Sequence, residues 1–143
     1  METETEHKVA ALYDVRLSIF REHEQLVQLV NELESRANGV IKGEGSAPPL
    51  DDALVLLHGR LVRHLDSEEA RLLPLLSVAP KDAAAILRGL LGEHTDQRAR
   101  IDGLLQDRTV FTDARTLARE ALAFVNAIRM DMADEDAALR SLG

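Results

Sequence analysis

The feature that most constrains this sequence is a histidine and a glutamate, His64 and Glu68, placed four residues apart on an otherwise apolar stripe. On a helix this spacing puts both side chains on one face. The same face carries leucines before and after the pair, at Leu54, Leu57, Leu61, Leu72 and Leu75. A buried carboxylate without a partner loses much of its hydration energy. The pair must therefore meet partners or a metal ion inside the fold.

Composition favours helices over sheets. Hydrophobic residues make up 45% of the 143 residues, but the aromatic residues are limited to three Phe and one Tyr. Such a balance is typical of helices packed through Leu, Ala and Val. A chain of this length is expected to form one domain, residues 1–143, with a continuous core.

Charge and missing residue types exclude several classes of function. A net charge of -8 argues against a nucleic-acid surface, and no basic amphipathic stretch suggests a membrane face. Cysteine is absent, which excludes disulfides, thiolate zinc sites and iron–sulfur clusters and leaves nitrogen and oxygen donors for a metal. No signal peptide or apolar run of spanning length is visible, so the expected location is the cytoplasm.

Apolar residues spaced three and four apart predict four helices. The first three are expected over about residues 5–37, 51–76 and 82–106, and the fourth after a capping turn around Thr112 and Asp113. The glycine- and proline-rich segment 38–49 predicts a loop, and Pro74 is expected to kink or end the second helix. Short connections elsewhere predict an all-α, antiparallel up-down-up-down four-helix bundle.

All four predicted helices carry polar residues on their apolar stripes, and alternate helices carry equivalent ones. The first and third helices each offer a histidine that follows a glutamate, whereas the second and fourth each offer two donor residues four apart. The six candidates are His23, His64, Glu68, His94, Asp131 and Glu135. A bundle uses such an arrangement to hold two metal ions in its core. A rise of 1.5 Å per residue permits a common level for these residues without requiring it.

Other readings of these residues remain open. A single histidine on an apolar face is more often a satisfied core group than a ligand, and Arg98 could neutralise Asp131 in place of a metal. Tyr13 is expected in the core, and His58 on the flank of its helix. The acids beside the candidates are expected on solvated faces, with hydrogen bonds to the ligands as the alternative; they are Glu22, Glu24, Asp66, Glu69, Glu93, Asp134 and Asp136.

With these residues the chain resembles the hemerythrin-like, HHE cation-binding family over essentially its whole length. The resemblance implies a four-helix bundle that holds a non-haem di-iron centre, with acids that bridge the metals. It implies ligands at His23, His64, Glu68, His94 and Glu135. The chain has Asp131 where the family has a histidine, and Arg98 where some members have a further histidine. It therefore resembles a carboxylate-richer variant, for which reversible oxygen carriage is not expected.

Charge favours two metal ions over one. Glu68, Asp131 and Glu135 together contribute -3, so one divalent ion leaves -1, whereas two leave +1, which a bridging hydroxide would cancel. The donors suit iron, manganese or zinc, and the resemblance favours iron. We expect a non-haem dinuclear metal protein that binds or senses O2, NO, peroxide, iron or redox state. The alternatives are a small di-iron oxidase or peroxide-consuming enzyme, and a structural bundle with a degenerate or singly occupied site.

Overall fold

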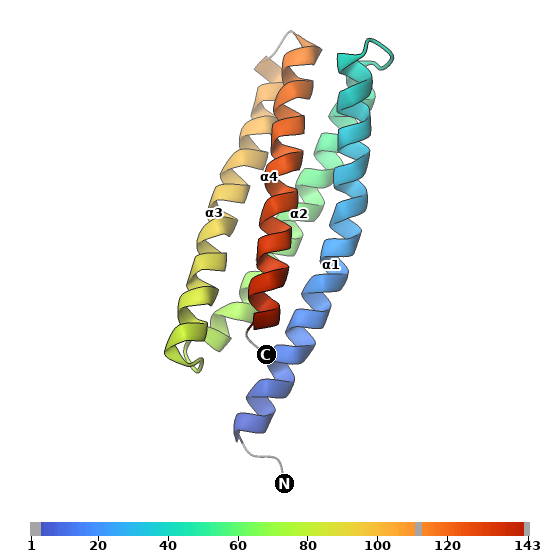
Figure 1. Cartoon of the computed structure of the whole chain (residues 1–143). Helices are drawn as coiled ribbons and strands as arrows, with labels where there is room; N and C mark the ends of the chain where they lie inside the picture. The colour runs from blue at the N-terminus through green and yellow to red at the C-terminus, as the bar shows by residue number, and fades with distance from the viewer. Residues whose placement is uncertain (1–3, 111–112, 142–143) are drawn as a thin grey trace.

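Four long helices make up the part of the chain that the structure describes. The computed structural model describes residues 4–110 and 113–141, with side chains for 13–108 and 113–141. The helices are α1 (Glu4–Ile41), α2 (Ala47–Leu76), α3 (Lys81–Val110) and α4 (Ala114–Ser141). They run up and down side by side, with α1 and α3 each packed between α2 and α4 (Figure 1). The predicted all-α four-helix bundle is confirmed.

The first connection is shorter than predicted. α1 continues to Ile41 and α2 already begins at Ala47, so the prediction of a loop over 38–49 was wrong at both ends. Pro48 and Pro49 lie in the first turn of α2, where a backbone N–H has no helical partner and its loss costs little. Gly43, with φ 76°, adopts the left-handed conformation that reverses the chain.

Other predicted helix boundaries are close to the observed ones. Pro74 lies inside the last turn of α2, which ends at Leu76 as expected. At the start of α4, the Asp113 carboxylate accepts hydrogen bonds from the Arg115 backbone N–H at 3.0 Å and the Thr116 hydroxyl at 3.1 Å. The predicted cap at Asp113 is thereby confirmed. Thr112, named with it, lies outside the described residues.

The interior divides into two apolar cores with a polar layer between them. The large apolar core fills the end of the bundle near the α1–α2 connection and includes Leu33, Leu57 and Ile128. The small apolar core, at the opposite end, consists of Ile19, Leu72, Leu87, Leu90 and Leu139. Between them every helix contributes to the polar layer, whose buried members are His23, His64, Glu68, His94, Gln97 and Glu135.

Tyr13 does not lie in the core. Its side chain is 58% exposed, because α1 extends past the other helices at its N-terminal end (Figure 1). The prediction that Tyr13 is buried was therefore wrong: the apolar period of α1 continues beyond the helices that could cover it. Within the described residues, no helix is both long enough and apolar enough to cross a membrane.

Candidate metal centre

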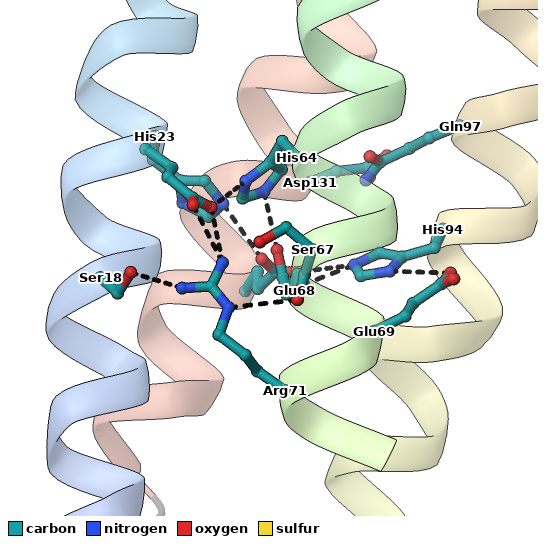
Figure 2. Close-up of polar contacts among 12 residues, drawn as sticks. Ser18, His23, His64, Ser67, Glu68, Glu69, Arg71, His94, Gln97 and Asp131 are labelled. Carbon is teal, nitrogen blue, oxygen red and sulfur yellow. Dashed lines mark hydrogen bonds and ion pairs between the residues drawn. The ribbon is translucent and has the colours of Figure 1, made fainter.

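The four helices bring five of the six candidate ligands together. His23 comes from α1, His64 and Glu68 from α2 and His94 from α3 (Figure 2). Glu135 comes from α4. Each of the five side chains belongs to a residue no more than 7% exposed. One donor atom from each of His23, His64, Glu68 and Glu135 lies within 4.8 Å of the others, so these four residues could hold a metal ion. His94 contacts both glutamates from the opposite side.

Each glutamate faces histidines with both of its oxygens. For Glu135, Oε1 lies 3.1 Å from Nε2 of His23, and Oε2 lies 3.1 Å from Nε2 of His94. For Glu68, Oε2 lies 2.7 Å from Nε2 of His64, and Oε1 lies 3.4 Å from Nε2 of His94. Each carboxylate thus spans two positions. One position is beside His23 and His64, and the other is beside His94.

A second set of acids binds the outer nitrogens of the three histidines. The Nδ1–carboxylate distances are 2.7 Å for His23 with Asp136, 2.7 Å for His64 with Glu22 and 3.3 Å for His94 with Glu69. In a neutral histidine, an acid at Nδ1 keeps the proton on that nitrogen. The lone pair of Nε2 then points toward the two central glutamates, which is the orientation that a metal ligand requires.

Two of these outer acids are held in turn by arginines. Arg71 donates to both oxygens of Glu22, at 2.8 and 3.0 Å. It also donates to the Ser18 hydroxyl (Figure 2). Arg98 donates to Glu69 at 2.5 Å and to Asp66 at 2.6 Å. One alternative had supposed that Arg98 neutralises Asp131. In this structure Arg98 instead neutralises Glu69 and Asp66 of α2.

The donor set fits a cation. Both oxygens of Glu68 are buried without a hydrogen-bond partner among the described residues, although histidine nitrogens lie close to them. When Nδ1 of a histidine carries the proton, its Nε2 atom is an acceptor. The lone pair of Nε2 then faces the lone pairs of the glutamate oxygens. Buried acceptors facing one another are costly unless a cation or protons lie between them. Nitrogen and carboxylate oxygen donors suit iron, manganese and zinc.

Protons are the competing cations. Burial lowers the pKa of His94, but Glu135 and Glu68 outweigh this effect and raise it to about 10. Burial likewise lowers the pKa of His23, which Glu135 raises above its ordinary value. Burial raises the pKa of Glu68, yet His64 and His94 hold it below the usual range. A metal ion that binds here must therefore displace protons from histidines.

Asp131 lies apart from the five clustered residues. Its carboxylate is half-buried and accepts a hydrogen bond from Gln97 at 3.4 Å, on the α3–α4 side of the polar layer (Figure 2). Burial raises the pKa of Asp131. Gln97, only 5% exposed, was not singled out from the sequence. The assignment of Asp131 as a ligand stays a prediction.

The outer acids are the residues that sequence reasoning placed on solvated faces. Each is next in sequence to a candidate ligand but binds the histidine of another helix: Glu22 precedes His23 and binds His64, whereas Asp136 follows Glu135 and binds His23. The sequence signal for these acids was that each adjoins a candidate ligand. On a helix, adjacent side chains are about 100° apart, so the acid beside a ligand points toward a neighbouring helix. His58, by contrast, lies on the flank of α2 as predicted. Its Nε2 atom lies 2.8 Å from Oδ1 of Asp102.

Comparison with known proteins adds the family. The family model described as hemerythrin HHE cation binding domain matches residues 18–141. That range includes all six candidate ligands. No curated protein and no solved structure matches the chain.

Proposed function

The chain belongs to the hemerythrin HHE cation-binding domain family, and from this premise we propose that its polar layer holds two iron ions bridged by Glu68 and Glu135. The family and the buried histidine–glutamate cluster together support metal binding. The number of ions, their identity and the small molecule that they meet are the proposed part. We propose O2, NO or peroxide as that molecule.

The observation that carries the proposal is the placement of the glutamate oxygens. One oxygen of each glutamate faces His23 or His64, and the other faces His94. A carboxylate with its two oxygens directed at different nitrogen ligands is suited to bridging two ions. His23, His64 and one oxygen from each glutamate would hold the first ion. His94 and the remaining two oxygens would hold the second.

The two positions differ in their protein ligands. The His94 position has three donors among the five clustered residues, one fewer than the other position. Iron, when bound, supplies redox chemistry and coordinates small ligands such as O2, NO or peroxide. The chain's own residues orient the imidazoles through Asp136, Glu22 and Glu69, and bury the donors away from water. We propose that the small ligand is taken up on the His94 side.

A metal-free structural layer is the second candidate, and the raised pKa of His94 favours it. With a pKa of about 10, His94 is protonated at neutral pH and pairs with Glu68 and Glu135 without any metal. Such a layer would be stable yet bind nothing.

Elemental analysis separates the two candidates. The full chain is purified, reconstituted with ferrous iron, manganese or zinc, and freed of loosely bound ions. We expect about two iron ions per chain, and loss of both in Glu68→Ala; a variant outside the layer, Glu34→Gln, should keep them. Failure of all three metals to remain bound would instead establish the structural layer.

A further inference from the structure

A groove runs between α1 and α2 on the outside of the polar layer. Its volume is about 650 Å³, within the range of small-molecule sites. Residues of both helices line it, and His64 and Glu22 belong to its wall. The Glu22 carboxylate is already bound to Arg71 and to Nδ1 of His64. The charge of that carboxylate is therefore largely met within the fold.

Two arginines in this groove lack a partner among the described residues. Arg60 and Arg63 are three residues apart on α2, are exposed, and make no ion pair or hydrogen bond with the residues that the structure describes. Elsewhere Arg71, Arg98 and Arg129 each bind a carboxylate. Two cations this close on one helix face repel each other. Arg88 and Arg119 are also exposed and make no ion pair or hydrogen bond with the described residues, but they lie outside the groove, so what distinguishes Arg60 and Arg63 is their shared place in its wall.

The opposite wall offers neutral donors and apolar surface. Gln25 and Gln28 of α1 line the groove, and neither makes a hydrogen bond with the described residues. Leu29 and Leu56 also line it, and Leu56 is 52% exposed. The groove thus combines two guanidinium groups and two amides with a hydrocarbon surface. This combination matches a ligand that has an anionic head and an apolar body.

We propose that the groove binds a small organic carboxylate, whose head lies between Arg60 and Arg63 and whose hydrocarbon body lies on Leu29 and Leu56. The planar guanidinium group matches the two oxygens of a carboxylate and forms the stronger, charge-assisted class of hydrogen bond. The site does not depend on the metal, because neither arginine is a metal donor. Since His64 lines the groove, the bound carboxylate lies beside a proposed metal ligand without replacing it.

Titration calorimetry on the full chain with octanoate as the probe tests this site. We expect one octanoate per chain, and a loss of affinity of about tenfold for Arg60→Gln and for Arg63→Gln, since each removes a hydrogen bond to a charged group. Arg88→Gln and Arg119→Gln are the matched controls. Both are exposed arginines outside this groove, on α3 and α4, and should bind octanoate like the wild type.

Two further probes separate the head of the ligand from its body. Inorganic phosphate and 1-octanol should both bind more weakly than octanoate, and Leu56→Gln should weaken octanoate while leaving phosphate unchanged. Equal binding of octanoate by wild type and by the Arg60→Gln/Arg63→Gln double variant would overturn the proposal, as would the absence of any binding. Metal content is measured on every sample. Binding that follows metal content instead of the arginines would place octanoate on the metal and also overturn it.

Discussion

The polar layer and the large apolar core are buried to the same degree but are held together differently. Glu68 and His94 are 0% exposed, as are Leu54 and Leu57 in the apolar core. Burial of the leucines is favourable by itself, at about 25 cal/mol per Å² of apolar surface. Burial of the glutamate and histidine is unfavourable unless each is paired. Equal burial therefore does not mean equal stabilisation: the leucines stabilise the fold by being buried, whereas the glutamate and the histidine depend on their partners.

The largest difference should appear when one residue of each region is removed. Glu68→Ala deletes a proposed bridge, so both ions should be lost, whereas His23→Ala removes one terminal ligand and should lose less metal. Leu57→Ala should keep its metal but lower the free energy of unfolding by about 2 to 5 kcal/mol, the usual cost of a cavity. Elemental analysis and urea denaturation measure the two effects.

Two results would break this contrast. Equal metal loss in Glu68→Ala, Glu135→Ala and His23→Ala would argue against bridging glutamates. Loss of metal in Leu57→Ala, with the fold intact by circular dichroism, would show that the two regions do not act separately.

Without metal, the contribution of the polar layer to the stability of the protein should depend on pH. The pKa of His94 is raised from 6.5 to about 10, so its contribution to stability is complete below about pH 6.5 and is lost as pH rises through 10. The pKa of Glu68 is lowered from 4.5, so its contribution is present above that pH and lost in acid. The metal-free protein should therefore be most stable above pH 4.5, where Glu68 contributes, and below about pH 6.5, where the contribution of His94 is complete.

The contribution of His94 is lost as pH rises, whereas a metal ion, which displaces protons from the histidines, binds more tightly as pH rises. The difference in melting temperature between metal-loaded and chelator-treated protein should therefore widen from about pH 6 to about pH 9. Thermal unfolding followed by circular dichroism measures it. Equal melting temperatures at both pH values would show that the layer needs no metal.

The helical period was enough to predict the bundle and to place His23, His64, Glu68, His94 and Glu135 on inward faces. These residues interrupt stripes whose other members are apolar, so their burial follows from the period alone. Whether all five are ligands stays a prediction. The clustered geometry is what such an assignment requires.

The outer acids could not be assigned from the period. Asp136 and Glu22 lie at the edges of their stripes, and their role depends on which helix is the neighbour on that side. That choice is set by how the bundle is assembled in three dimensions and not by the pattern within one helix. The start of α2 was missed for a local reason, because Pro48 and Pro49 were read as loop residues although proline is favoured in a first helical turn.

A milder change should act through an outer acid. Asp136→Asn keeps the shape of the side chain but removes the charge that lies 2.7 Å from Nδ1 of His23. Loss of a carboxylate behind a metal-binding histidine typically weakens metal binding by about tenfold or more. Glu34→Gln is the matched control, because Glu34 pairs with Arg129 on the surface between α1 and α4. A competition titration with a coloured chelator measures both variants; equal affinities would remove Asp136 from the centre.

The smallest effect is expected at Asp131, at the border between the polar layer and solvent. We propose that its carboxylate supplements the His94 position. Asp131→Asn keeps one side-chain oxygen donor, so it should weaken binding of the second ion and still leave two ions at saturation. A different result is expected if Asp131 binds no metal. Burial, Asp96 and Asp134 raise the pKa of Asp131, so a carboxylate that binds no metal is disfavoured in the folded state, and its removal should raise the melting temperature at pH 7. Melting temperature and metal affinity measured together decide: both fall if Asp131 is a ligand, whereas stability rises at unchanged affinity if it is not.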